Sequence, residues 1–295
     1  MSQTEVALTM EEQGVQAVLS GEITEAVETF LQLPQSPCPV RHFFSPGLYV
    51  REAHYKAGLL VIGHPHTGPH LNIMLKGKLI LLNQAGGGEV LEAPQMFTAG
   101  AGRKSAYILE DVIWQNIWAT EETDVEAIEA VVFAKEESFL QAQMKQKAEE
   151  DTTAIAAAQE DYLRWLQEIG KTEEEMTAIV HTPDLIPFPP GSYSIKLGES
   201  AIHGKGLFVT APIPAGATIC PMRIGVHRTP AGRFINHSDT PNSAMVRSEN
   251  GDLHLIALYS LRGCQGGFDG EELTLDYRQC LRMNHELKEM LCLDR

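Results

Sequence analysis

Three histidines in one short stretch are the first residues whose types and spacing could do chemistry. His64 and His66 alternate along a strand-like run, so both imidazoles face the same side of the chain. His70 adds a third nitrogen donor four residues later, and imidazole nitrogen is a common ligand of divalent transition metals. The spacing indicates that His64, His66 and His70 could hold a divalent metal. The alternative is a metal-free fold that serves assembly or binds a small ligand.

Three stretches near the other end of the chain carry a second set of chemical groups. Residues 204–206 are Gly-Lys-Gly between two expected strands, and glycines let the backbone come close to a ligand. Asn236 and His237 are polar residues within a partly apolar segment, and Tyr277 follows an expected strand. Taken singly, these features are typical of a strand turn, a buried hydrogen-bonding bridge and a packing tyrosine.

Taken in order, the three stretches resemble the SET domain of S-adenosylmethionine-dependent protein lysine methyltransferases. They are Ser200–Phe208 with its His-Gly-Lys-Gly segment, Arg233–Asn242 with the sequence Arg-Phe-Ile-Asn-His-Ser-Asp-Thr-Pro-Asn, and Gly270–Tyr277 with the sequence Gly-Glu-Glu-Leu-Thr-Leu-Asp-Tyr. The resemblance covers about the last third of the chain. It implies a β-rich fold in which the second stretch passes beneath a later strand.

The resemblance also implies the roles of individual residues. Tyr277 is the expected catalytic residue, and its hydroxyl would orient the methyl group and the incoming amine. With an ordinary pKa of about 10, it would be neutral at pH 7 and would not act as a strong base. The cofactor would be S-adenosylmethionine, and the expected cofactor-binding residues are Gly204, Lys205, Gly206, Arg233, Asn236, His237 and Tyr277.

The histidine stretch resembles the first motif of the cupin β-barrel. Gly58, His64-Pro-His66, His70 and Gly77 follow the spacing of that motif, with His70 where the family has a glutamate. The region that would contain the second motif, residues 94–116, has no histidine. This departure leaves the metal-free barrel open as the alternative.

The elements that position these residues follow from periodicity and from turn residues. Apolar residues recur every four positions in residues 1–35, with a break at Gly21, which predicts short helices. An apolar stripe predicts a helix over 136–169, and Thr172 with Glu175 forms a capping box that opens a second helix. Short strands separated by turns are expected at Gly47–Val50, Gly58–Ile62, Leu71–Leu75, Lys78–Leu82, Val112–Trp118 and Ile128–Phe133, with a hairpin turn at Gly86-Gly87-Gly88.

These elements predict a multidomain, mainly β protein. The expected parts are an N-terminal helical segment (1–35), a cupin-like β-barrel (36–134), a helical connector with a Pro-rich linker (135–190), and a β-rich SET domain (191–295). The SET domain would end in a helix over Arg278–Leu293, with Leu281, Leu287, Met290 and Leu291 as its apolar residues.

Composition limits the partners and the compartment. The net charge of the 295 residues is −16, and no basic face for phosphate contacts is visible, so we expect no nucleic-acid partner. No apolar run is long enough to span a membrane. The five cysteines form no CxxC pair, which is typical of a reducing compartment. We expect a cytoplasmic protein, located in the host cytoplasm or the virion if it is bacteriophage-encoded, as the combination of domains suggests.

Three functions follow from these expectations. The first is a protein lysine methyltransferase that acts on a protein or peptide substrate. The second is a virus or phage structural or assembly protein that uses both folds for oligomerisation or ligand binding, without turnover. The third is a metal-dependent cupin enzyme with the SET part as an accessory. We expect a homo-oligomer or a component of a larger assembly.

Overall fold

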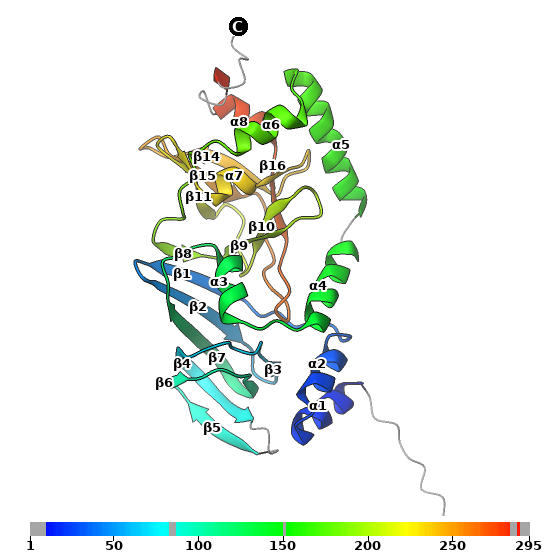
Figure 1. Cartoon of the computed structure of the whole chain (residues 1–295), viewed down its shortest axis with the longest axis vertical. Coiled ribbons are helices and arrows are strands. Elements are labelled where there is room, and N and C mark those ends of the chain that lie inside the picture. Colours follow the sequence, from blue (N-terminus) through cyan, green and yellow to red (C-terminus); the bar gives the residue numbers. More distant parts are fainter. Residues whose placement is uncertain (1–9, 83–86, 150–151, 284–287, 290–295) are drawn as a thin grey trace, which may run out of the picture. The chain divides into compact units, whose positions relative to one another are not determined.

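The computed structural model describes residues 10–82, 87–149, 152–283 and 288–289 (Figure 1). The chain divides into two compact units. Unit 1 comprises Met1–Cys38, Val50–Trp118 and Glu129–Gln146, and unit 2 comprises Pro39–Tyr49, Ala119–Ile128 and Lys147–Arg295. The four segments expected from the sequence stay a prediction. Runs of strands are interrupted by a few helices in both units, so the expected mainly β fold with several helices is confirmed.

The strands of unit 1 are organised around one long strand, β4. This strand pairs antiparallel with β5, β6 and β7, and β3 pairs with β7. β4 and β5 form a hairpin, with Leu82 opposite Gly88. Of the three residues predicted as its turn, Gly86 lies outside the described residues and Gly88 already begins β5, a strand that the sequence did not predict. The strands are β3 (Leu60–Ile62), β4 (His70–Leu82), β5 (Gly88–Glu92), β6 (Gln95–Ala99) and β7 (Ser105–Ala119), while β2 (Leu48–Tyr55) has residues in both units.

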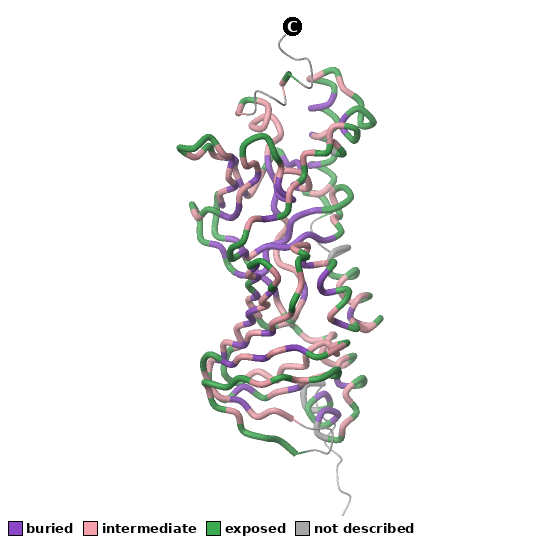
Figure 2. Tube along the Cα trace, turned by 60° about the vertical axis from the view of Figure 1, so that its left-hand side comes forward, coloured by how far each residue is buried: buried purple, intermediate pink, exposed green. Residues whose placement is uncertain are grey.

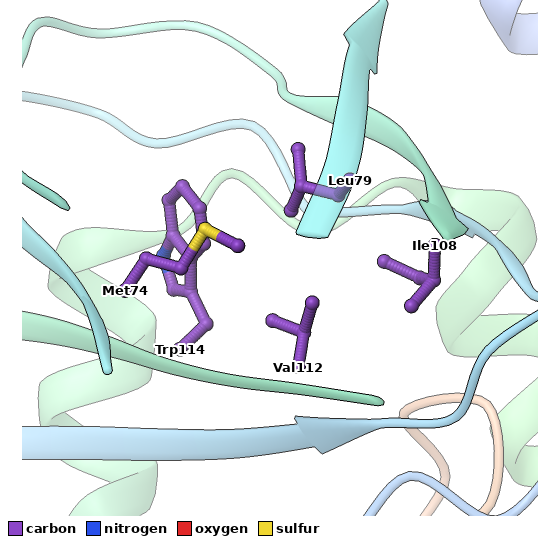
Figure 3. Close-up of a cluster of buried hydrophobic side chains, with 5 residues drawn as sticks. All are labelled: Met74, Leu79, Ile108, Val112 and Trp114. Atoms are coloured by element: carbon purple, nitrogen blue, oxygen red, sulfur yellow. The ribbon is translucent and has the colours of Figure 1, made fainter. Parts of the chain in front are cut away.

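The core of unit 1 is built from inward-facing residues of β4 and β7. From Val112 to Asn116 of β7, buried positions alternate with more exposed ones, as expected for a strand with one face against a core. Figure 2 shows the buried positions in purple along the chain. Burying a large apolar side chain of this kind stabilises a fold by about 1.5–3 kcal/mol. The cluster consists of Met74, Leu79, Ile108, Val112 and Trp114, whose side chains converge in Figure 3.

Two helices precede the strands of unit 1, as the sequence predicted. They are α1 (Met10–Ser20) and α2 (Ile23–Phe30). Gly21 separates them and has a φ of 85°, a left-handed conformation that glycine adopts without strain. Ala17, Val18 and Ala26 form a small buried cluster between the two helices.

The strand predicted at Ile128–Phe133 is wrong, because this segment belongs to the helix α3 (Val125–Val132). Val125 and Ile128 are buried three residues apart, which is helical spacing. The Asp124 carboxylate accepts a hydrogen bond of 3.0 Å from the backbone N–H of Glu126 and so caps the first turn. The β-branched residues of the segment favoured a strand locally, but the cap and the spacing of buried residues fix a helix.

Unit 2 contains two four-stranded sheets. Their strand orders are β13-β16-β10-β9 and β12-β11-β15-β14, and β1 pairs with β8 at one end of the eight-stranded sheet. Leu207, Leu255, Leu273 and Leu275 are fully buried in these sheets. The strands are β1 (Val40–Ser45), β8 (Gly191–Tyr193), β9 (Ile195–Glu199), β10 (Lys205–Val209), β11 (Thr218–Ile224), β12 (His227–Arg228), β13 (Asn236–His237), β14 (Ser243–Arg247), β15 (Leu253–Ala257) and β16 (Glu272–Leu275).

Helices of unit 2 flank these sheets. Trp165 and Leu166 of α5 pack with Met176 of α6 and with Leu281 of α8. The capping box predicted at Thr172 is confirmed, with both reciprocal hydrogen bonds present. The helices are α5 (Thr152–Ile169), α6 (Glu173–Val180), α7 (Pro230–Phe234) and α8 (Tyr277–Met283), while α4 (Glu137–Glu149) continues from unit 1.

The predicted helix over 136–169 corresponds to α4 and α5, and residues 150–151 between them lie outside the described residues. The predicted C-terminal helix begins at α8, and its later apolar residues Leu287, Met290 and Leu291 also lie outside the described residues. Within the described parts of the chain, no helix combines the length and apolar character needed to cross a membrane.

Candidate functional site

The Asn236 side chain is the meeting point of the three stretches singled out in the sequence. Its Nδ2 atom lies 3.2 Å from the Lys205 carbonyl oxygen, 3.1 Å from that of His203 and 2.8 Å from Glu272 Oε1. Ser200 Oγ is 2.9 Å from the same nitrogen. The glycine loop, the Asn-His segment and the last strand are therefore brought together around one buried amide.

Backbone pairing also brings the Asn-His segment and the last strand together. The short strand β13 pairs in parallel with β16, although the two are separated by more than thirty residues of chain. Asn242 ties the next turn to β16, because its Oδ1 accepts the N–H of Thr274 at 2.9 Å and its Nδ2 donates to the Glu272 carbonyl at 2.7 Å. Ser243 Oγ donates to the Thr274 carbonyl at 2.6 Å. These bonds hold the Asn-His segment against the last strand.

The backbone N–H and C=O groups of His237 lie at the edge of β13 that faces away from β16. β13 is the end strand of its sheet, with β16 on one side. The N–H of Ser238 donates to the Leu275 carbonyl at 3.2 Å. Because neighbouring residues of a strand direct their backbone groups to opposite edges, the N–H and C=O of His237 point away from β16. An end strand of this kind offers a donor and an acceptor to a further partner.

The His237 side chain is held by a carboxylate from α5. Its Nε2 lies 2.9 Å from Asp161 Oδ2, and its Nδ1 accepts the backbone N–H of Tyr277 at 3.2 Å. A backbone N–H can only donate, so Nδ1 carries no proton and Nε2–H donates to Asp161. Arg278 also binds Asp161, at 2.7 Å, and this bond is the main reason why the pKa of Asp161 is lowered. The ionised carboxylate thus sets the tautomer of His237.

Tyr277 is enclosed by aromatic side chains. Its hydroxyl donates to the Ile235 carbonyl oxygen at 2.7 Å. Its ring centroid lies 5.2 Å from that of Trp165, 6.0 Å from that of Tyr162 and 5.1 Å from that of His237. Burial is the largest cause that raises the pKa of Tyr277 above its usual value, so the phenol stays protonated at neutral pH.

The two glycines of the loop differ in their surroundings. Gly204 has a φ of 51°, and a Cβ built on it would meet no atom within 4 Å, so the space beside it is open. A Cβ on Gly206 would fall onto the Glu272 carboxylate, which shows that this glycine is needed for packing. Lys205 between them extends toward Glu126, with Nζ 3.5 Å from the carboxylate. Of the expected cofactor residues in this loop, Gly204 is thus the one with open space beside it.

The Arg233 side chain pairs with groups of the protein itself. Its guanidinium lies 2.8 Å from Asp184 Oδ1 and also donates to the Thr182 carbonyl oxygen. Both partners lie in the Pro-rich segment that precedes β8. The structure thus directs the Arg233 side chain toward that segment, whereas the sequence predicted contact with a cofactor.

Sequence reasoning missed the contribution of α5. The helix was interpreted as a connector, yet it supplies Asp161, Tyr162 and Trp165 to the surroundings of His237 and Tyr277. A signal was present, because Asp161 is a charged residue directly beside Tyr162 of the apolar stripe. A buried carboxylate in that position needs a partner such as a histidine or an arginine.

The three histidines of unit 1 do not form a ligand set. The rings of His66 and His70 stack with centroids 3.8 Å apart and an interplanar angle of 8°, so their nitrogens do not converge on one point. His64 packs edge-on against Phe139, with centroids 4.5 Å apart. Burial lowers the pKa of His64 and His66 to about 3 each.

The Lys104 ammonium also occupies the position at His70 Nε2 where a metal would bind. The Lys104 ammonium lies 3.0 Å from His70 Nε2, and His70 Nδ1 lies 3.1 Å from the Gly68 carbonyl oxygen. An ammonium can only donate, so Nε2 is the acceptor and its lone pair is occupied. Within the described ranges, no group of three or more His, Cys, Asp or Glu residues has a metal-binding arrangement. These residues therefore do not fit the divalent metal that the sequence suggested.

No protein-family model matches the chain, and no curated protein sequence matches it significantly.

Several solved structures are similar to a part of the chain. KdgF from Halomonas sp. is 15% identical, covers 28% of this chain and 80% of its own, and has a TM-score of 0.24. An RmlC-like cupin family protein with a double-stranded β-helix fold, from Methanocaldococcus jannaschii, is 9% identical over 28% of this chain and 81% of its own, with a TM-score of 0.25. A protein from Shewanella frigidimarina that contains a cupin-2 domain is 12% identical over 26% of this chain and 74% of its own, with a TM-score of 0.22.

The second and third of these structures are described as cupins, which is the fold the sequence predicted for part of the chain. The SET domain and the bacteriophage origin stay predictions.

Proposed function

We propose that unit 2 is an S-adenosylmethionine-dependent protein lysine methyltransferase with a SET-like fold. The observation that carries this proposal is the position of the Tyr277 hydroxyl, 2.7 Å from the Ile235 carbonyl and next to the segment that joins the glycine loop. A neutral phenol beside a backbone carbonyl presents two oxygens to the same small region. Two oxygens can align a polarised methyl group and an amine without acting as a base.

The groups around this region fit the proposed cofactor. The open space beside Gly204 gives a ligand access to the loop backbone. The outward-facing N–H and C=O of His237 form the donor and acceptor pair that the edge of an adenine ring can bind. The side chains of Asn236 and His237 already have protein partners, so their role is to hold this backbone in place. When bound, the cofactor supplies the methyl group on a sulfonium.

The residues of the chain would contribute positioning more than proton chemistry. The substrate lysine must arrive as a neutral amine, and its proton can leave to water. With its own proton donated to Ile235, the Tyr277 oxygen keeps lone pairs that can accept a hydrogen bond from the amine. Asp161 keeps His237 in the tautomer that accepts the Tyr277 N–H, and this fixes the backbone from which the phenol extends. Asp161 is therefore a positioning residue.

Transfer of a labelled methyl group tests the proposal. Full-length protein is incubated with labelled S-adenosylmethionine and a cell lysate that serves as a pool of lysine substrates. We expect label on discrete protein bands, and loss of the label with Tyr277→Phe. The matched control is Tyr259→Phe, because the Tyr259 hydroxyl also donates to a backbone carbonyl, that of Pro241 at 3.0 Å, but on an exposed side chain. Equal labelling by the Tyr277→Phe variant would contradict the assigned role.

A second function is favoured by one specific observation. Asn236 Nδ2 and both ring nitrogens of His237 have hydrogen-bond partners within the protein. Side chains that are tied to the protein in this way also suit an assembly protein in which the SET-like fold only builds a rigid surface. Stable large particles in light scattering at low concentration, together with no transfer of label, would support this alternative.

For unit 1, we propose a cupin-like barrel without a metal. Support comes from the pairing of one long strand with three others and from the cation beside His70. Metal analysis of the full-length protein after incubation with divalent transition metals tests this reading. A stoichiometric ion bound through the histidines would contradict it.

A further inference from the structure

We propose that unit 1 binds a small organic carboxylate at a cluster formed by His66, His70, Lys104, Trp118 and Phe133, with Lys104 as the anion-binding group. The inference depends on the side chains of unit 1 alone and is independent of the proposed methyl transfer.

The loop before β7 brings Lys104 to the histidines. The N–H of Gly63 donates to the Lys104 carbonyl at 2.9 Å, and His66 and Gly102 exchange two backbone hydrogen bonds of 2.9 Å each. This short ladder places the Lys104 ammonium 3.0 Å from His70 Nε2. The side chain is half-buried, and burial lowers the pKa of Lys104.

Lys104 differs from two other cationic side chains of this region because no described carboxylate pairs with it. Arg103 lies 2.7 Å from Glu136, and Lys135 lies 2.7 Å from Glu129. For Lys104, no carboxylate is found within ion-pair distance among the residues that the structure describes. Its one described partner is a neutral imidazole. A partly desolvated ammonium without a counter-ion is unfavourable, so the site is arranged to gain from an added negative charge.

The surroundings define the kind of anion. The stacked rings of His66 and His70 lie beside Trp118, with centroids 5.8 and 5.6 Å from its ring, and Phe133 packs edge-on against His66 at 5.0 Å. Aromatic walls with a few polar groups are typical of sites for small organic molecules. His66 Nδ1 is buried and has no hydrogen-bond partner among the described residues, so a hydrogen bond to a ligand oxygen would remove an unfavourable unpaired group. One ammonium balances one negative charge, which favours a monocarboxylate over phosphate.

Calorimetric titration of the full-length protein with benzoate tests the inference, with acetate and inorganic phosphate as comparison probes. We expect saturable benzoate binding with one site per chain and no comparable binding of phosphate. Lys104→Met should weaken benzoate binding about tenfold or more, since a charge-assisted hydrogen bond is lost. Lys104→Arg should keep part of it. The matched control is Lys56→Met, because Lys56 is an exposed lysine of the same unit, paired with Asp111.

Thermal melting is a second measurement, and it tests binding on the unchanged protein. Benzoate should raise the melting temperature of the unchanged protein, because a ligand that binds the folded state stabilises it. Lys104→Met should itself melt at the same temperature or higher, since it removes an uncompensated charge. Failure of both benzoate and acetate to bind, equal binding by Lys104→Met, or a preference for phosphate would each overturn the inference.

Discussion

The link between Asp161 and His237 gives the sharpest test of how unit 2 is held together. Asp161→Ala removes the acceptor of the His237 Nε2–H and leaves that group buried, since His237 is 3% exposed. A buried donor without a partner costs about 1–3 kcal/mol. Arg278 also loses a partner, but it is partly exposed and keeps two bonds to Glu168, so solvent screening limits this loss to about 0.5–1 kcal/mol. We expect a destabilisation of about 1.5–4 kcal/mol.

Urea unfolding measures this difference. Trp165 lies in the same helix and is fully buried, so its fluorescence reports on the region directly. The chain has three tryptophans, and a background with Trp114→Phe and Trp118→Phe leaves Trp165 as the remaining one. Glu160→Ala is the matched control, because Glu160 is an exposed carboxylate on the same helix and should change stability by less than about 0.5 kcal/mol. A change of that small size in Asp161→Ala would refute the reasoning.

The pH dependence of the same difference adds a check. Hydrogen bonds from Arg278 and His237 lower the pKa of Asp161 in the folded protein. A carboxyl group with a lowered pKa contributes stability above its unfolded pKa, about 3.9, and loses it as the pH falls through the folded value. The difference between the unchanged protein and Asp161→Ala should therefore be constant between about pH 5 and 8 and shrink below about pH 4.

Three further predictions concern other parts of the chain. Gly206→Ala should displace the Glu272 carboxylate and destabilise unit 2 by about 1–3 kcal/mol in urea unfolding; unchanged stability would contradict the described packing. Burial lowers the pKa of His64 to about 3, so its contribution to stability is complete above about pH 6.5 and is lost as the pH falls toward 3. The melting temperature of His64→Phe minus that of the unchanged protein should therefore be larger at pH 4 than at pH 7. An equal difference at both pH values would argue against a neutral buried imidazole. Thr172→Ala should cost about 1 kcal/mol through loss of the capping box, measured by the same melts against Thr177→Ala, and no loss would mean that the cap contributes nothing.

Local sequence signals predicted the elements whose patterns are strong. The capping box at Thr172 and the two helices around Gly21 follow from a few neighbouring residues, and the structure contains both. The strand predicted at Ile128–Phe133 failed because the same β-branched residues also fit helical spacing. The side chain of Asp124 and the packing of the helix decided between the two.

The site was only partly predictable, because its contacts join distant parts of the chain. The order of the three stretches suggested that they converge, and Asn236 does join them. The role of Asp161 depends on a contact across 76 residues, which no local pattern specifies. In unit 1, the spacing of His66 and His70 fitted a metal motif, but the ring stacking and the ammonium of Lys104 follow from three-dimensional packing alone.

Binding of S-adenosylmethionine tests the central claim most directly, because it requires no knowledge of the substrate. Calorimetric titration of the full-length protein should show saturable binding with one site per chain. Tyr277→Phe should keep this binding while it loses methyl transfer. Gly204→Asn should weaken the binding, because asparagine tolerates a positive φ and its side chain would fill the open space beside the loop. Absence of binding by a folded, unmodified protein would contradict the methyltransferase proposal and favour the assembly protein.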